Sequence, residues 1–276
     1  MDTFFLLKLL ASFVGGGALI IAVTCLAERS NPRLAGLISA LPTTLVNGVI
    51  FITIATDIHG AAHAMSILPT GVLAVMAFTV GFASWYPRGL MAALIGGGIP
   101  WILFAFLAIS LPANVWLHLT FLILLYPFFA LYASTFPKLK APKVQATTNE
   151  LVIRALVAGM AISTVLVVTK YAGPIWGGIF TCFPAAIFCT LYLMARKYGP
   201  DFAKTLARNM PHGSAGCGLF GVAFYLTAPH FGNITGLIIG ITAGYITAIC
   251  SSLFLSDFFY KWQTKIFTFP AKEDNI

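Results

Sequence analysis

Long apolar runs constrain this chain more than any other feature of its sequence. Hydrophobic residues make up 59% of the 276 residues and charged residues only 9%. The mean hydropathy of +0.92 is far above that of an ordinary soluble domain. The runs are about 20 residues long and continuous, which predicts membrane-spanning helices, since barrel strands alternate over about ten residues. We expect nine spans, at 4–27, 34–56, 62–86, 89–111, 114–136, 151–171, 174–196, 208–229 and 233–256.

One spacing of proline and glycine occurs twice, at an offset of 142 residues. Three positions match, pairing Pro32 with Pro174, Gly36 with Gly178 and Pro42 with Pro184. Such a coincidence indicates an internal duplication. The two copies begin five spans apart, so equivalent helices cross the membrane in opposite directions. The predicted fold is therefore an all-α polytopic membrane protein with two inverted four-helix repeats, interrupted at proline in the second and seventh helices. The repeats are 1–112 and 151–256, joined by a connector helix and cytoplasmic linker at 113–150 and followed by a cytoplasmic tail at 257–276.

Basic residues give the expected orientation. With the N-terminus outside, 14 of the 16 lysines and arginines fall in cytoplasmic connections, and only Lys8 and Lys170 fall toward the other face. This asymmetry is the one that guides membrane insertion. We therefore interpret the net charge of +8 as a topology signal and not as a nucleic-acid footprint. The C-terminus is expected in the cytoplasm.

A short segment carries a family resemblance. Residues 33–44 contain Ala-Gly-Leu and then Pro-Thr-Thr, and they follow a glycine-rich first helix. Over about residues 8–110 the chain resembles the GlpM-like family of small bacterial inner-membrane proteins. The resemblance implies a four-helix unit and a bacterial inner membrane, and it implies little about substrate. The second copy departs from the pattern, because Phe183-Pro184-Ala185 lacks the threonine.

The two duplicated prolines are the predicted centre of the chemistry. A proline inside a helix removes a backbone donor and displaces a carbonyl, leaving polar groups that lipid cannot satisfy. If the helices break there, the new half-helices direct free amides toward the middle of the membrane, where they favour an anion. Alternatively, the prolines only kink the helices and nearby hydroxyls bond to the preceding turn. The expected substrate-binding residues are Ser39, Pro42, Thr43, Thr44, Asn47, Thr181, Cys182 and Pro184, with Arg208 attracting an anion at the cytoplasmic entrance.

Other ionisable residues narrow the substrate class. All eight acidic residues fall outside the middle of the expected spans, which argues against cations and favours an anionic, zwitterionic or amphiphilic solute. His63 and His212 are candidates for proton coupling. Lys8 is close enough to the end of its span to extend outward. We expect no metal and no cofactor, and the five cysteines are interpreted as small core residues.

Two classes of function follow. The first is a secondary-active transporter or lipid-type flippase that moves an anionic or amphiphilic solute by alternating access. The second is a non-transporting membrane scaffold or accessory subunit. An enzyme is not expected, because the sequence offers no Ser-His pair, His-Glu-x-x-His helix or paired carboxylates. The expected partners are membrane lipids and the solute, with no nucleic acid, and a homodimer remains an open alternative.

Overall fold

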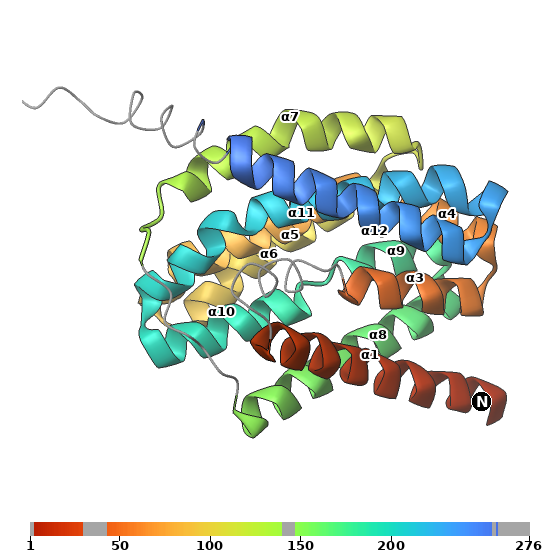
Figure 1. Cartoon of the computed structure of the whole chain (residues 1–276), viewed down its shortest axis with the longest axis horizontal. Coiled ribbons are helices and arrows are strands. Elements are labelled where there is room, and N and C mark those ends of the chain that lie inside the picture. The colour runs from red at the N-terminus through yellow and green to blue at the C-terminus, as the bar shows by residue number, and fades with distance from the viewer. Residues whose placement is uncertain (1–2, 30–42, 140–146, 256–257, 259–276) are drawn as a thin grey trace, which may run out of the picture.

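The computed structural model describes residues 3–29, 43–139, 147–255 and 258, and every regular element in these ranges is helical (Figure 1). This agrees with the predicted all-α class. The elements are α1 (Thr3–Arg29), α3 (Thr43–Ala55), α4 (Ile58–Met65), α5 (Leu68–Trp85), a 3₁₀ turn (Tyr86–Arg88), α6 (Leu90–Ser110), α7 (Val115–Ser134), α8 (Thr148–Ala172), α9 (Pro174–Thr181), α10 (Ala185–Tyr198), α11 (Pro200–Phe231), α12 (Asn233–Cys250) and a π-helical turn (Ser251–Leu255).

Seven helical segments are long and apolar enough to cross a membrane, which makes the chain a multi-pass membrane protein. They coincide with seven of the nine expected spans. The segments are Thr3–Leu26, Leu68–Arg88, Leu90–Ser110, Val115–Ser134, Thr148–Ala172, Pro174–Tyr198 and Asn233–Leu255. Of the expected span 34–56, the structure describes only α3, a shorter apolar helix, and the rest lies outside the described residues.

The other expected span, 208–229, lies inside α11, which begins earlier than expected, at Pro200. This helix has 32 residues and is not among the seven apolar segments. It packs against α4, α5, α7, α10 and α12, and it runs through the centre of the fold (Figure 1). A helix surrounded by other helices does not need a lipid-facing apolar surface, so its polar residues are tolerated.

The expected span 62–86 is also divided. α4 ends at Met65 and α5 begins at Leu68, with Pro69 in the first turn of α5. Proline lacks the amide that a continuous helix would require. Ser66 closes the preceding helix, since its backbone N–H bonds to the carbonyl oxygens of Ala62 and His63. The result is a turn at Ser66–Ile67 that separates the two helices.

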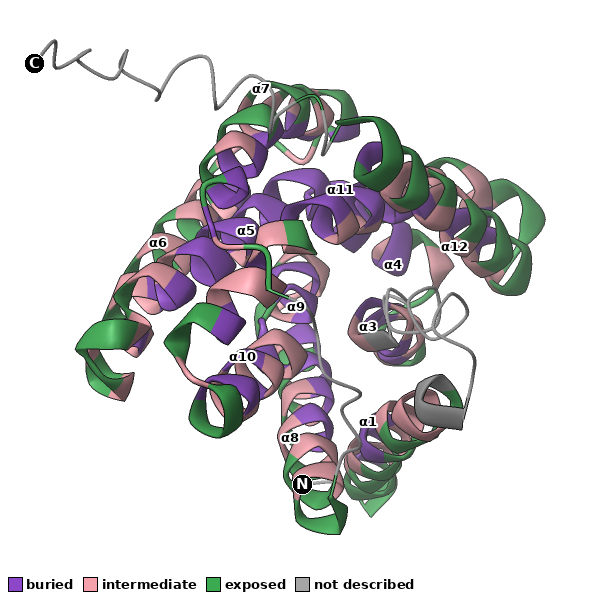
Figure 2. Ribbon diagram, turned by 60° about the vertical axis from the view of Figure 1, so that its left-hand side comes forward, coloured by how far each residue is buried: buried purple, intermediate pink, exposed green. Residues whose placement is uncertain are grey.

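The core is built on α5 and α11. In the span that contains α5, 83% of the most apolar 18-residue stretch is buried. The corresponding share is 17% in α1 and in the last span, Asn233–Leu255. Figure 2 shows the same contrast, with mostly buried residues on α5 and α11 and many exposed ones on α1, α6, α7 and α12. The outer helices expose large aliphatic and aromatic side chains. This is the arrangement expected for a helical bundle whose outer surface faces lipid.

Two helix pairs pack in closely similar ways. In α5 the rings of Phe78 and Phe82 are stacked with centroids 5.6 Å apart, and in α11 those of Phe220 and Phe224 are stacked 6.2 Å apart. These pairs are separated by 142 residues, the offset of the repeated prolines. Each first phenylalanine also contacts a glycine of the following helix, Gly97 in α6 and Gly240 in α12.

Those following helices also begin alike. Gly89 precedes α6 with φ 107°, and Gly232 precedes α12 with φ 88°. Residues other than glycine adopt such positive φ angles at a cost, so the two turns need glycine. Gly232 thus joins α11 to α12 directly, and Gly89 joins the 3₁₀ turn after α5 to α6.

Helices from the two halves cross antiparallel. In α1 and α8, Ser12 Oγ lies 3.2 Å from Ser163 Oγ, and Gly17 lies against the carbonyl of Ala155. Residue numbers therefore rise along α1 as they fall along the facing part of α8. The pair α5 and α11 behaves in the same way, because Leu68 contacts Gly221 whereas Val72 contacts Gly218.

Candidate functional site

The helix interruption expected at Pro184 is present in the structure. α9 ends at Thr181 and α10 begins at Ala185. The last turn of α9 tightens, with the Cys182 N–H bonded to Ile179 O and the Phe183 N–H to Phe180 O, both at 3.0 Å. Pro184 stands at the start of α10, and its carbonyl accepts the Phe188 N–H at 2.7 Å. Proline is well placed there because the first helical amides need no intrahelical acceptor.

Side chains satisfy the polar groups at this break. Trp101 of α6 donates its indole N–H to Cys182 O over 3.2 Å. Thr181 Oγ1 donates to Gly178 O at 2.6 Å. The Trp101 ring also meets Phe183 edge to face, with centroids 5.4 Å apart. Trp101 was not among the residues expected at the site, although a tryptophan inside an apolar run is a signal, since its buried N–H needs an acceptor.

Neighbouring helices enclose the residues just before the break, whereas Phe183 within it is 45% exposed. Thr181 and Cys182 are each 3% exposed. A Cβ on Gly48 of α3 would lie 2.3 Å from Thr181 Cγ2, and one on Gly71 of α5 would lie 2.8 Å from Cys182 Sγ. On the α4 side, Gly178 lies against the backbone carbonyl of Ala64. The structure thus brings α3, α4 and α5 to the residues just before the proline.

The expected contacts from the first copy are only partly described. Asn47 is buried in α3, one residue before the glycine that meets Thr181, and Thr44 is partly buried one turn earlier. Thr43 begins α3, but its side chain lies outside the described part of the structure. Ser39 and Pro42 also lie outside the described residues. Of the predicted contact between the second and seventh helices, the described residues therefore include the part between α3 and α9.

Arg208 is engaged with the end of another helix. Its guanidinium Nη1 donates to the carbonyl oxygens of Ser134 and Phe136, at the C-terminus of α7. These contacts favour an anchoring role for Arg208, because cations stabilise helix C-termini.

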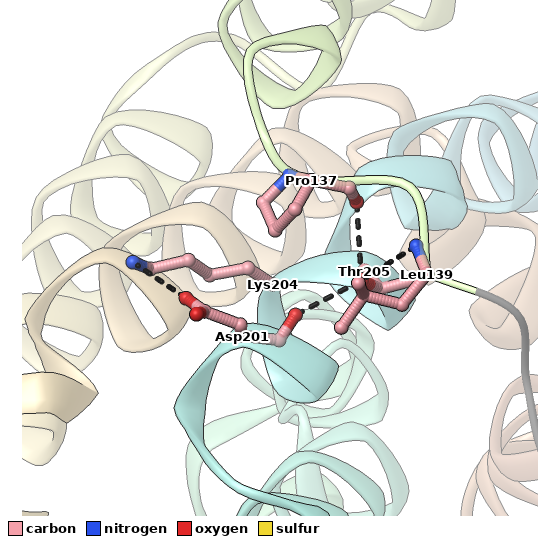
Figure 3. Close-up of polar contacts among 5 residues, drawn as sticks. All are labelled: Pro137, Leu139, Asp201, Lys204 and Thr205. Carbon is pink, nitrogen blue, oxygen red and sulfur yellow. Dashed lines mark hydrogen bonds and ion pairs between the residues drawn. The ribbon is translucent and has the colours of Figure 1, made fainter.

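Contacts one turn earlier join the same two segments (Figure 3). Thr205 Oγ1 donates to Pro137 O at 3.1 Å, and the Leu139 N–H lies 3.4 Å from Thr205 Oγ1. Within α11, Asp201 contacts Lys204 Nζ over 3.4 Å. The Thr205 contacts fix the start of α11 to the segment that follows α7.

His212 lies deep in the fold. It is 4% exposed, and its Nδ1 lies 2.7 Å from the hydroxyl oxygen of Tyr126 in α7. Ser251 Oγ donates to the backbone carbonyl of His212 at 3.4 Å. The imidazole thus sits where α7, α11 and the end of α12 meet.

His63 lies in a separate pocket of about 330 Å³. The lining residues come from α4 and from the end of α11, and they are His59, Ala62, His63, Tyr225, Leu226, Pro229 and His230. His59 and His63 are one helical turn apart, so they share a face of α4. Within the described residues, no group of three or more His, Cys, Asp or Glu side chains is arranged to hold a metal ion.

No family model, curated protein or solved structure matches this chain. The resemblance of residues 33–44 to the GlpM-like family therefore stays a prediction.

Proposed function

We propose that the chain is a secondary-active transporter or lipid-type flippase for an anionic or amphiphilic solute in the bacterial inner membrane. The observation that carries the proposal is the interruption of an apolar span between Thr181 and Ala185. Non-helical backbone at membrane depth occurs where it is buried in protein or lines a cavity. Discontinuous helices at the interface of two repeats are the usual substrate sites of secondary transporters.

The repeated packing supports two inverted repeats. α1 and α8 cross antiparallel with Gly16 beside Ala158, which are 142 residues apart. The phenylalanine pairs of α5 and α11 keep this offset, and these two helices also cross antiparallel. A pseudo-twofold axis in the membrane plane would produce such crossings. Rocking of one repeat against the other would then expose the interrupted helices to either side in turn.

The distribution of carboxylates supports an anionic or amphiphilic solute. The side chains of Asp57, Glu150 and Asp201 are the described ones, and each lies at the start of a helix. Asp57 and Glu150 accept backbone N–H groups there, at 2.7 and 2.9 Å. None of these three is available at the break to balance a cation. The first amides of α10 instead favour negative charge.

The second candidate, a non-transporting scaffold, is favoured by a different observation. The carbonyl of Cys182 is already bonded by Trp101, and the Thr181 hydroxyl bonds within its own turn. The pocket beside His63 and the one beside Lys8 are lined by other described residues and not by Thr181 or Cys182. A break that serves only to shape helix packing would have these properties.

Reconstituted protein distinguishes the two candidates. The probes are fluorescent phosphatidylglycerol for movement between leaflets and a panel of organic anions for currents on supported membranes. Thr43→Val with Thr44→Val should reduce transport by about 5- to 150-fold, because it removes direct hydrogen bonds to the solute without replacing them. Pro184→Ala should also reduce it, by allowing α9 and α10 to join.

Thr164→Val is the matched control, because this exposed hydroxyl bonds only to Met160 O in its own helix. Transport by the parent and control proteins, lost in the two site variants, supports the transporter. Activity no greater than that of protein-free vesicles for every probe would favour the scaffold.

His63 and His212 are the residues proposed for proton coupling. His212 has a polar partner in Tyr126, and His63 faces a pocket. With a pH-sensitive dye inside the vesicles, His212→Gln should abolish proton movement that accompanies transport of an active probe. Exchange of that probe across the membrane without a proton gradient should remain. Unchanged proton movement in both His63→Gln and His212→Gln would remove them from the mechanism.

A further inference from the structure

Two lysines from opposite halves of the chain line one pocket. Lys8 of α1 and Lys170 of α8 border a space of about 180 Å³ whose other lining residues are Phe4, Phe5, Ala55 and Leu166. These are the two basic residues that the charge pattern assigns to the outer face. Their meeting follows from the antiparallel crossing of α1 and α8, which places the start of one helix beside the end of the other.

Both ammonium groups have neutral partners in the described structure. Lys8 Nζ donates to Ile54 O at 3.0 Å. Lys170 Nζ lies 3.7 Å from the centroid of the Phe5 ring. The ion pairs found among the described residues are Lys197–Glu150 and Lys204–Asp201, so neither pocket lysine is paired with a described carboxylate. Two like charges beside an apolar pocket favour binding of an anion.

Exposed aromatic side chains lie at the pocket. Phe4 of α1 lines the pocket and is 69% exposed. Tyr171, next to Lys170, is 68% exposed and packs its ring edge against Phe5. Exposed aromatic residues beside cations at the end of an apolar helix are typical of the level of lipid headgroups.

We propose that this pocket binds the phosphate group of an anionic membrane phospholipid. Lys8 and Lys170 contact the phosphate oxygens, and the rings of Phe4 and Tyr171 lie at the level of the lipid headgroup. The site is separate from the interrupted helix and does not depend on transport. A bound lipid would join α1 to α8, and thus the two halves of the chain.

Helix capping is the competing explanation for the lysines. Lys8 bonds near the C-terminus of α3, and Lys170 lies in the last turn of α8, where cations are stabilising without any ligand. Capping predicts that removal of the lysines lowers the stability of the lipid-free protein. A lipid site predicts, in addition, the loss of a lipid-dependent signal.

The test is binding of phosphatidylglycerol to the purified, delipidated full-length protein, measured by native mass spectrometry and by the lipid-dependent shift in melting temperature. The probes are phosphatidylglycerol, diacylglycerol with the same acyl chains, and inorganic phosphate. Lys8→Gln with Lys170→Gln should weaken phosphatidylglycerol binding by about 10- to 30-fold, since each lysine near the membrane surface contributes about 1 kcal/mol to anionic-lipid attraction. Lys8→Arg with Lys170→Arg should restore it.

The matched control is Lys138→Gln with Lys204→Gln, which removes two lysines elsewhere and should leave binding unchanged. Equal binding by parent and Lys8/Lys170 glutamine variant would overturn the proposal, as would equal binding of diacylglycerol. Inorganic phosphate that binds as tightly as the lipid would overturn the lipid assignment. The carboxylate of Asp2 lies outside the described residues, so Asp2→Asn tests whether it neutralises Lys8 or Lys170. Phosphatidylglycerol binding by Asp2→Asn but not by the parent would mean that the chain neutralises its own lysines, and it would also overturn the proposal.

Discussion

At the scale of single residues, Trp101 shows how an interrupted helix is kept inside an apolar fold. The interruption between α9 and α10 leaves the carbonyl of Cys182 without a helical donor, and the indole N–H of Trp101 supplies one from α6. The ring also packs against Phe183. One side chain therefore provides both a hydrogen bond and apolar contact at the break.

Replacing Trp101 by phenylalanine separates these two contributions. Trp101→Phe keeps an aromatic ring but leaves Cys182 O without its donor, so we expect a loss of about 1–3 kcal/mol in the free energy of unfolding. Reversible unfolding in mixed detergent micelles measures this change. Trp116→Phe is the control, because Trp116 is 59% exposed. Equal stability of both variants would show that the hydrogen bond contributes little.

At the scale of helices, glycine decides how closely the paired helices approach. A Cβ on Gly81 of α5 would lie 2.0 Å from the backbone oxygen of Gly96 in α6, and one on Gly216 of α11 would lie 2.4 Å from that of Gly244 in α12. Real side chains cannot approach a carbonyl so closely, so the helices would have to separate. Small residues of this kind are the usual basis of tight helix packing in membranes.

Gly81→Ala and Gly216→Ala should each destabilise the protein by about 1–3 kcal/mol, the usual cost of overpacking. Gly98→Ala in α6 and Gly213→Ala in α11 are the matched controls, because nothing lies within 4 Å of a Cβ at either position. In the controls we expect no loss, since alanine is the better helix former. Unfolding in mixed micelles compares the four variants. A loss of similar size in the controls would contradict the packing explanation.

At the scale of the whole molecule, the antiparallel crossings of α1 with α8 and of α5 with α11 relate the two halves. The basic-residue asymmetry predicts the orientation of this arrangement, with the N-terminus outside.

Single cysteines in a cysteine-free background test this orientation. With the N-terminus outside, an impermeant thiol reagent added to intact cells should label positions 57, 113 and 232, and it should not label positions 33, 140 and 204. Labelling after permeabilisation controls for accessibility. The reversed pattern would place the N-terminus in the cytoplasm, and a mixed pattern would contradict the inverted repeats.

Local features of the sequence predicted a substantial part of this fold. Seven of the expected spans were recognisable because a lipid-facing helix must be apolar over about 20 residues. The interruption at Pro184 was one of two alternatives, since a proline inside a helix removes a backbone hydrogen-bond donor. Pro100, Pro127 and Pro211 lie inside unbroken helices, so proline by itself does not decide between a break and a kink.

Only the tertiary structure decided which polar groups meet. Arg208 was expected to attract a substrate, yet its guanidinium contacts the carbonyls of Ser134 and Phe136, which are more than 70 residues away in sequence. The surroundings of α11 likewise explain why this central helix is less apolar than a lipid-facing span. Apolar length is encoded along the chain, whereas the partners of Trp101, Arg208 and Lys170 depend on how helices distant in sequence cross.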